Sequence, residues 1–594
     1  MAYFKLDRFS GIAPGVSPRL LAQQFGQAAR NIDFESGRLT PTTGPVNEYT
    51  LQNSVRRSIY YYRDTNWLEW DADNVKAVPG PIPGDTLDRL YWTGDGYPKM
   101  GTAVTMISGT SGYPANSYRL GVPAPANAPV ISKTGTPDPD QTPDDVAYVY
   151  TFVTAYGEEG PPSPASNVLE RTDTETVTIP MPSSDHPSGN YNFGSGALKR
   201  IYRSNTGSTN TTFQFVAEVP FTTVSYDDTS ASFALGEVLP SETWIGPPDD
   251  DTSLYPDGPL QGLTAVANGV FAGFTGKRFC LSEPYLPHAW PIAYRITLEE
   301  EIVAIASVAN GVICLTNGAP YFVTGTDPSA MTAIKSDLAQ ACVNINSVVD
   351  MGSYVLYASP DGLCAVSGSE GRVVTQGLIS PKQWNDDFDP TTYRAFKYEN
   401  TYVAFKNIAT GGDAGFVFDP RAEEAALSTI SSSTVIRGGH MDPKDGQLYL
   451  ISGSNIIKYR GGTTANTLLW KSKQFVTPRP LSMSWVSVHA QEVPFSVRVW
   501  ADKVLIADYT FDENAASGGP GGGGSGPGPG NGHELTSPYV QTVSTPSGVS
   551  DGYLYEPIMR LPSVIAQVWE VEVSGAVEVD EICLAQSIDE IREL

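Results

Sequence analysis

The chain has 594 residues, which is too long for one hydrophobic core and predicts three or four domains. Frequent glycine (57) and proline (47), with 10% aromatic and only 17% charged residues, are typical of an all-β protein with many turns and exclude a disordered chain. A net charge of −27 argues against tight binding to nucleic acid, because no local cluster of basic residues offsets it. No apolar run reaches the roughly 18 residues of a membrane helix, so no membrane span is expected, and the start lacks a signal-peptide pattern.

Residues 1–50 differ from the rest and are expected to form a docking segment. Ser17 is a plausible N-cap with Pro18 at the first helical position, so a short helix is predicted over 17–24. Residues 27–41 then predict two strands separated by a turn at Ser36 and Gly37, the second strand being closed by Pro41.

Residues 51–122 are predicted to supply the first strands of a propeller. Aromatic strand-like segments occur at 58–62 and 66–70, and the segment 88–96 continues the pattern. Residues 123–245 then interrupt these strands with a proline-rich entry and several short β runs, the longest at 146–154. Short strands at this spacing predict an inserted β-sandwich of the fibronectin type III or immunoglobulin kind.

Residues 246–480 carry the main repeat of the sequence. A small polar corner followed by an apolar and aromatic strand recurs about every 42 to 48 residues, which is the period of a four-stranded propeller blade. The corners are Ala267-Asn268-Gly269, Ala309-Asn310-Gly311, Asp350-Met351-Gly352, Glu399-Asn400 and Asp445-Gly446. This stretch is therefore predicted to form the blades of a β-propeller.

Residues 481–594 alternate strictly between apolar and polar positions, for example at 495–500 and 568–573, and predict a C-terminal β-sandwich. A glycine-rich stretch at 517–530 has no side chains with which to pack, so it is expected to form an extended or flexible loop.

The search for catalytic chemistry finds no organised constellation. The histidines lack metal-site spacing, and no phosphate loop or nucleophile elbow occurs. Acidic tracts at 138–145 and 249–258 lack the spacing of a calcium loop and are interpreted as solvated linkers. The five cysteines are odd in number and form no C-x-x-C motif, so reduced core residues are expected. The chain is predicted to be no enzyme and to need no metal or cofactor.

Several segments, taken in order along nearly the whole chain, resemble virion proteins of tailed bacteriophages. They are AARNIDFESGRLTP at 28–41, LYWT at 90–93, YRLGVP at 118–123, YTFVTAYGEEGPPS at 150–163, VEVSG at 571–575 and ICLA at 582–585. The chain is similar to the tail-tube nozzle proteins of short-tailed, podovirus-like phages. The glycine-rich loop at 517–530 has no counterpart in that family pattern.

The resemblance implies a structural virion protein. It implies a homohexameric ring below the portal and adaptor, assembled in the bacterial host cytoplasm and located in the virion tail, whose propellers surround a conduit used in genome retention and ejection. The implied partners are further copies of the chain, adaptor or head-to-tail connector proteins, tail fibre or needle proteins, and viral double-stranded DNA that passes without tight binding. The candidate assembly residues are Asn31, Asp33, Gly37 and Pro41.

Six copies of a chain with a charge of −27 would carry about −162, and this repulsion would keep DNA from adhering to the wall. Lysines and arginines facing the lumen are therefore expected to be sparse or paired. Basic residues expected to serve blade or subunit contacts are Lys277, Arg278, Lys382 and Lys397. A glycan-binding or glycan-cleaving tail protein built on a propeller is the alternative, because a fold does not fix its function.

Overall fold

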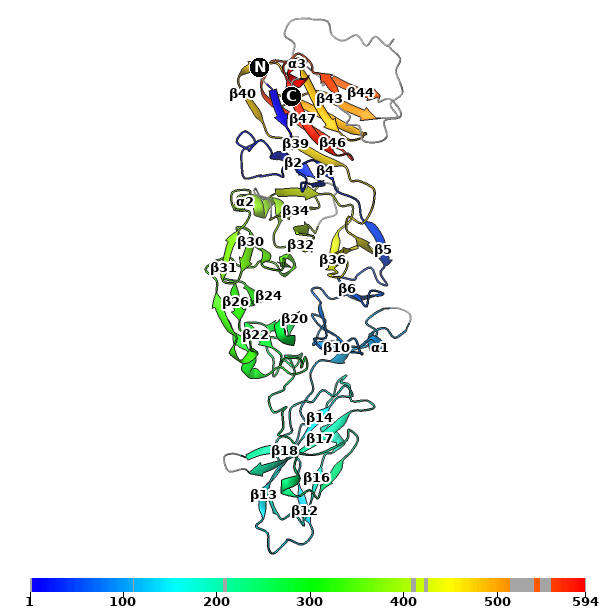
Figure 1. The fold of residues 1–594 in the computed structure, drawn as a ribbon, viewed down its shortest axis with the longest axis vertical. Coiled ribbons are helices and arrows are strands. Elements are labelled where there is room, and N and C mark those ends of the chain that lie inside the picture. The colour runs from blue at the N-terminus through cyan, green and yellow to red at the C-terminus, as the bar shows by residue number, and fades with distance from the viewer. Residues whose placement is uncertain are drawn as a thin grey trace.

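The computed structural model describes residues 3–109, 112–206, 211–407, 413–420, 426–512, 539–544 and 557–592. These residues form three bodies along one long axis, with a propeller in the middle and a β-sandwich at each end (Figure 1). The all-β propeller fold with two sandwiches is thus confirmed. The glycine-rich stretch 517–530, predicted to be a loop, lies outside the described residues.

Within the described residues, six small sheets and the first four strands of an 11-stranded sheet form the seven blades of the propeller. The blades are numbered around the ring, and their strands are given from inner to outer: blade 1 has β36 (Ile436–Met441), β37 (Leu448–Ser452), β38 (Asn455–Lys458) and β5 (Val46–Thr50); blade 2 has β6 (Ser58–Tyr62) and β7 (Asn66–Trp70); and blade 3 has β8 (Lys76–Pro79), β9 (Leu90–Thr93), β10 (Lys99–Gly101) and β11 (Tyr118–Arg119). Blade 4 has β20 (Gln261–Ala265), β21 (Phe271–Thr275), β22 (Arg278–Leu281) and β23 (Ile296–Thr297), and blade 5 has β24 (Ile302–Val308), β25 (Gly311–Thr316), β26 (Tyr321–Thr324) and β27 (Thr332–Lys335). Blade 6 has β28 (Val349–Asp350), β29 (Val355–Ser359), β30 (Gly362–Ser367) and β31 (Glu370–Val373), and blade 7 has β32 (Arg394–Tyr398), β33 (Thr401–Phe405), β34 (Gly415–Asp419) and β35 (Ala426–Ile430).

The ring closes by joining two distant parts of the chain. In blade 1 the outermost strand β5 pairs antiparallel with β38, with Tyr49 opposite Ile456. Blades 2 and 3 meet through a shared apolar core that contains Trp70 and Trp92. Main-chain hydrogen bonds between the first and last strands of the propeller therefore hold the circle shut.

Burial explains why the blade strands differ in composition. The second strands β21, β25 and β29 are buried along their whole length because neighbouring blades cover both of their faces. The outer strands β27 and β31 are largely exposed and polar. Each repeated polar corner of the sequence is the turn between the first and second strand of a blade, as between β20 and β21.

The inserted sandwich enters after β11 and returns before β20, and the two linkers touch. At Gly121, which has a φ of +99°, a Cβ would lie 2.8 Å from Cα of Gly246. Any larger residue would separate the linkers. The elements of the sandwich are β12 (Ser132–Thr134), β13 (Asp144–Val146), β14 (Tyr148–Val153), β15 (Leu169–Arg171), β16 (Thr176–Pro180), β17 (Leu198–Thr206), β18 (Thr211–Pro220) and β19 (Ser225–Asp228). Its two three-stranded sheets, β12-β16-β19 and β14-β17-β18, pack across a core of aromatic and β-branched residues.

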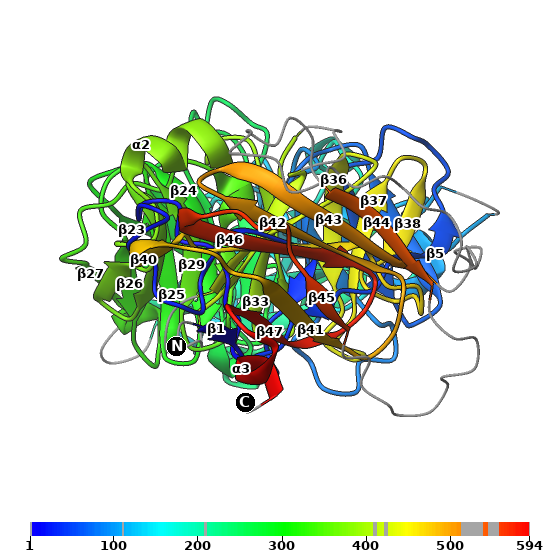
Figure 2. The same ribbon diagram turned by 90° about the horizontal axis from the view of Figure 1, so that it is seen from above.

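The C-terminal sandwich is completed by strands from the start of the chain. Its elements are β1 (Tyr3–Leu6), β2 (Gly26–Arg30), the β3 (Ile32–Asp33) and β4 (Thr40–Pro41) hairpin, β39 (Leu468–Ser472), β40 (Phe475–Leu481), β41 (Trp485–Ala490), β42 (Phe495–Ala501), β43 (Val504–Asp512), β44 (Tyr539–Ser544), β45 (Ile558–Arg560), β46 (Ala566–Gly575) and β47 (Val579–Ala585). One sheet has the order β1-β47-β41-β45, and the other runs from β2 through β39, β46, β42 and β43 to β44. Figure 2 looks down on this end of the molecule, with β46, β42 and β43 nearest the viewer.

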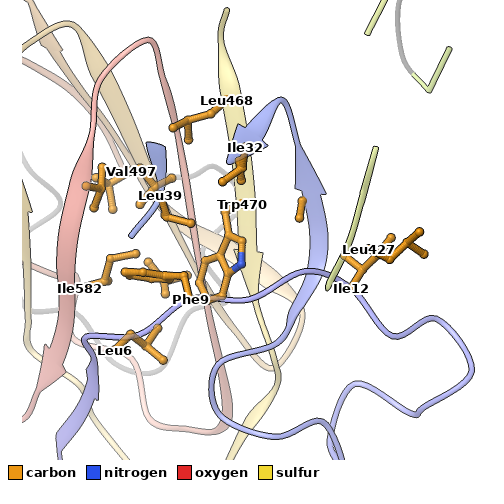
Figure 3. Packing of buried hydrophobic residues seen from close by; sticks show 14 of the residues in the cluster. Leu6, Phe9, Ile12, Ile32, Leu39, Leu427, Leu468, Trp470, Val497 and Ile582 are labelled. Carbon is orange, nitrogen blue, oxygen red and sulfur yellow. The ribbon is translucent and has the colours of Figure 1, made fainter. Parts of the chain in front are cut away.

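Strand β2 joins the C-terminal sandwich to the propeller. It pairs antiparallel with β39 on one side and parallel with β35 of blade 7 on the other, where Arg30 lies opposite Thr429. Beside this junction, Trp470 and Phe9 pack edge to face among Leu6, Ile32 and Leu468 (Figure 3). Blade 7 and the C-terminal sheet therefore share one continuous hydrogen-bonded sheet.

Two domain boundaries and one predicted helix differ from the sequence-based expectations. Residues 1–50 do not form a separate segment, because β1 pairs with β47 and β5 belongs to blade 1. The blades end at Lys458, and β39 and β40 belong to the C-terminal sandwich, because their partner is β46. Residues 17–24 form turns and no helix. The main-chain oxygens of Pro18 and Leu21 accept from the Gln474 amide and the Lys473 ammonium, and not from amides one helical turn further along.

The described helices are short. They are α1 (Ala103–Met106), α2 (Pro381–Gln383) and α3 (Ile588–Arg592). Among the described residues, no helix has the length and apolar character needed to cross a bilayer.

Candidate functional site

The inner strands of the propeller enclose a channel with two adjoining cavities. Their volumes are about 350 and 330 Å³. The residues that line both cavities are Asp73, Asn74, Lys76, Ile345, Val348 and Asp350. The first cavity extends toward blades 7, 1 and 2, and the second extends toward blades 4 and 5. Cavities of this size are typical of small-molecule sites.

The charge of this channel is opposite to that of the whole chain. Four cationic side chains line the first cavity, and two carboxylates accompany them. The cations are Arg57, Lys76, Arg394 and Lys397, and the carboxylates are Asp73 and Asp350. His440 adds no charge near neutral pH because burial lowers its pKa to about 4. An excess of two positive charges thus lies inside a chain whose net charge is −27.

One ion pair crosses the channel. Arg394, the first residue of β32 in blade 7, donates to both carboxylate oxygens of Asp73 at 2.7 and 2.6 Å. Asp73 lies in the connection between blades 2 and 3, so this pair bypasses blades 1 and 2. Arg394 also donates to Oδ1 of Asn346 at 2.9 Å, at the entry to blade 6. A bidentate guanidinium–carboxylate pair fixes geometry well, so Arg394 braces three parts of the ring.

The two lysines have no comparable partners. Lys397 donates to the main-chain oxygen of Met351 at a long 3.4 Å. The ammonium group of Lys76 has no ion pair or hydrogen bond with the described part of the chain, and its surroundings in the channel lower its pKa by desolvation. Its side chain remains accessible to solvent because it lines the open cavity rather than a packed core. Burial also raises the pKa of Asp350, which the Gly352 amide and Lys397 partly oppose.

Aromatic side chains form one wall of the first cavity. Tyr60, Trp70 and Phe396 line it together with His440. The rings of Tyr60 and His440 lie 4.9 Å apart. The cavity thus combines flat apolar surfaces with lysine ammonium groups, an arrangement suited to a small anion that carries an apolar part.

The four residues predicted from the resemblance do not lie in the channel. They gather at the β3–β4 hairpin, where Asn31 and Asp33 flank Ile32, which pairs with Pro41. Asn31 is buried, and its amide donates to Ser431 Oγ at 2.8 Å and to the Thr467 main-chain oxygen at 3.0 Å. These contacts join the N-terminal segment to the propeller and the C-terminal sandwich, so Asn31 stabilises the fold within one subunit.

The remaining members of the set are more accessible. Asp33 forms an ion pair of 2.9 Å with Arg460. Gly37 sits at the hairpin turn with a φ of +77°, and a Cβ there would meet nothing within 4 Å. Contacts of Asp33, Gly37 or Pro41 with other subunits stay a prediction.

Other sequence-based candidates have structural roles. All five cysteines are free and buried, as predicted. In the acidic tract at 249–258, Asp249 and Asp250 form ion pairs with Arg119. Within the residues that the structure describes, no group of three or more histidine, cysteine, aspartate or glutamate side chains could hold a metal ion.

Sequence reasoning missed most of the channel residues. It named Lys397, but only as a blade or subunit contact, and Asp350 only as part of a repeated corner. The usable signal lies just before each corner, because the first strand of a blade faces the axis. Arg394 and Lys397 occupy that strand immediately before the Glu399 corner.

Comparisons with known proteins give a limited result. No family model matches the sequence, and no curated protein matches it. Matched solved structures include YCF48 from Cyanidioschyzon merolae, with 11% identity over 48% of this chain and 76% of that chain at a TM-score of 0.19. The WD40 domain of Neurospora crassa Pan2 has 6% identity over 49% and 86% at 0.22. The C-terminal WD40 domain of Sif2 has 10% identity over 48% and 91% at 0.19. At these scores the superpositions do not bear on function, and the propeller assignment rests on the strand order of this chain.

Proposed function

We propose that the chain is a structural subunit of a phage tail nozzle, and that copies of it form a ring around the path of the DNA. The observation that carries the proposal is the charge of −27. Several exposed cations are already neutralised, because Arg278 pairs with Asp257, Lys382 with Asp386 and Lys444 with Asp64. A wall of this kind repels phosphates and lets a duplex slide.

The shape of the subunit supports the same role. The two sandwiches project from opposite sides of the propeller, which gives a long subunit (Figure 1). The N-terminal segment stiffens one of these junctions, since β1 and β2 lie in the C-terminal sandwich and β5 lies in blade 1. A ring of six such subunits would line a long section of the conduit and offer separate ends to different neighbours.

The proposed partners follow from this arrangement. They are further copies of the chain, adaptor or connector proteins, tail fibre or needle proteins, and double-stranded DNA in transit. The propeller's own channel is not the DNA path, because its cavities of about 350 and 330 Å³ admit only small molecules. The proposed location is the tail of the virion, and no catalytic step belongs to the role.

Weak binding to DNA is the first test of this proposal. In a fluorescence anisotropy titration at about 50 mM salt, the purified protein should show no measurable binding to double-stranded DNA. The reason is that few unpaired cations are available to replace the counterions of the DNA. A basic DNA-binding protein assayed beside it provides the positive control. Tight binding that falls steeply as salt rises toward about 200 mM would contradict the conduit and indicate a component that grips DNA.

The glycan-directed alternative makes a different demand on the channel. A glycosidase needs two carboxylates that are free to act on the substrate. Arg394 binds both oxygens of Asp73, so Asp73 and Asp350 do not form such a free pair. Depolymerisation of host polysaccharide by the purified chain would support the alternative and overturn the structural role.

A further inference from the structure

We propose that the propeller channel binds a small phosphate-bearing molecule, held by Lys76 and Lys397 beside the aromatic wall of the first cavity. This inference goes beyond the nozzle role and does not depend on it. It rests on the cavity, on the excess of positive charge around it, and on the absence of a protein partner for Lys76 among the described residues.

The charge balance points to an anion as the occupant. An anion inside a concave site interacts with all the cations that line it, and this attraction is stronger there than on an open surface. Lys76 lines both cavities, and its solvent-accessible ammonium has no counter-charge within the described residues. Carboxylates outnumber cations by 65 to 38 in the whole chain, whereas four cations and two carboxylates line the first cavity. Their convergence is therefore a local feature that needs its own explanation.

The carboxylates of the channel do not remove this excess. Asp73 is engaged by Arg394 through two short hydrogen bonds, and Arg57 approaches it only at 3.9 Å. Asp350 accepts from the Gly352 amide at 2.7 Å, so one carboxylate faces Lys76 and Lys397. Lys76, Lys397 and the exposed Arg57 thus remain available to a ligand.

The size and walls of the site define the class of ligand. A volume of about 350 Å³ accommodates a small molecule, whereas a duplex or a folded partner cannot enter. Several ammonium and guanidinium donors around one centre match the oxygens of a phosphate group better than a single carboxylate. Tyr60 and Phe396 lie beside these donors and can contact an apolar or planar part of the same molecule.

Isothermal titration calorimetry with inorganic phosphate tests the site directly, and ionic strength is held constant with sodium chloride. We expect saturable binding by the full chain and a loss of about tenfold or more in affinity for Lys76→Met. Lys397→Met should show a similar loss and serves if Lys76→Met does not fold. The matched control is Lys382→Met, because Lys382 is exposed on α2 and, within the part of the chain that the structure describes, forms its ion pair with Asp386; it should bind like the parent chain.

Adenosine monophosphate forms the second arm and tests the aromatic wall. If the ligand carries a planar group, adenosine monophosphate should bind more tightly than phosphate, and Phe396→Ala should remove that gain without affecting phosphate binding. Absence of phosphate binding by the parent chain, or equal affinity in Lys76→Met and Lys382→Met, would overturn the proposal. Neither result bears on ring formation, so the nozzle role would remain open to its own test.

Discussion

Replacing Asp228 with alanine is expected to destabilise the inserted sandwich by about 3 to 5 kcal/mol, because it leaves two buried guanidinium groups without a counter-charge. Asp228 is fully buried, and Arg171 and Arg203 are each only 1% exposed. One carboxylate oxygen accepts from Arg203 at 2.8 Å, from Arg171 at 3.3 Å and from the Tyr148 hydroxyl at 2.8 Å. Its loss therefore removes these three hydrogen bonds and the acceptor of the Ser230 amide. Within the described part of the chain, the guanidinium groups keep only main-chain acceptors, Ser230 for Arg203 and Thr172 for Arg171.

Chemical denaturation followed by limited proteolysis would measure the effect. The first unfolding transition of the Asp228→Ala chain should occur at a lower denaturant concentration than that of the parent chain. The protease should cleave first between residues 123 and 245. The matched control is Asp227→Ala, since the neighbouring Asp227 is exposed and, among the described residues, its carboxylate accepts from the Thr178 hydroxyl alone. That variant should change stability by less than about 1 kcal/mol. An Asp228→Ala chain as stable as the control would refute the role assigned to the network.

Replacing Trp470 with alanine is expected to lower the free energy of unfolding of the C-terminal sandwich by about 3 to 5 kcal/mol. The Trp470 side chain is fully buried in β39 and meets the ring of Phe9 at a centroid distance of 5.0 Å. Its indole nitrogen donates to the Ser10 main-chain oxygen at 3.2 Å. The substitution therefore leaves a large cavity and removes the side-chain contacts that hold Phe9 and Ser10 against the sheet.

Thermal unfolding together with hydrogen exchange would detect both consequences. Amides of residues 9–12 should exchange faster in Trp470→Ala, and the melting temperature of the C-terminal body should fall. Trp500→Ala is the control, because Trp500 is half-buried and contacts the Lys471 ammonium, which lies 4.0 Å from its ring centroid. A cation–π contact of this kind contributes about 1 kcal/mol. Equal losses of stability in the two variants would show that Trp470 does not stabilise the junction more than an ordinary half-buried tryptophan.

Local sequence patterns predicted the propeller because its blades repeat the same turn. Each blade needs a tight connection between its first and second strands, and the small polar corners such as Asn310-Gly311 satisfy that need. The insertion was also readable, since its strands interrupt the spacing of the blades. These features depend on neighbouring residues, so one sequence contains the signal.

Features that depend on long-range pairing could not be read in the same way. Strands β39 and β40 alternate like blade strands, and only their pairing with β46 assigns them to the C-terminal sandwich. Strand β1 finds its partner β47 at the other end of the chain. The channel site has the same origin, because Lys76 and Lys397 come from blades 3 and 7 and line one cavity only when the ring closes.

Electron microscopy of the purified protein, or of virions that contain it, tests the central claim most directly. The account predicts a six-membered ring with an open central lumen, an acidic inner surface, and propellers arranged around that lumen with their own channels outside the DNA path. Lys277, Arg278, Lys382 and Lys397 should not project into the lumen as unpaired cations. A monomer without a ring, or a lumen lined by unpaired lysine and arginine, would contradict the account.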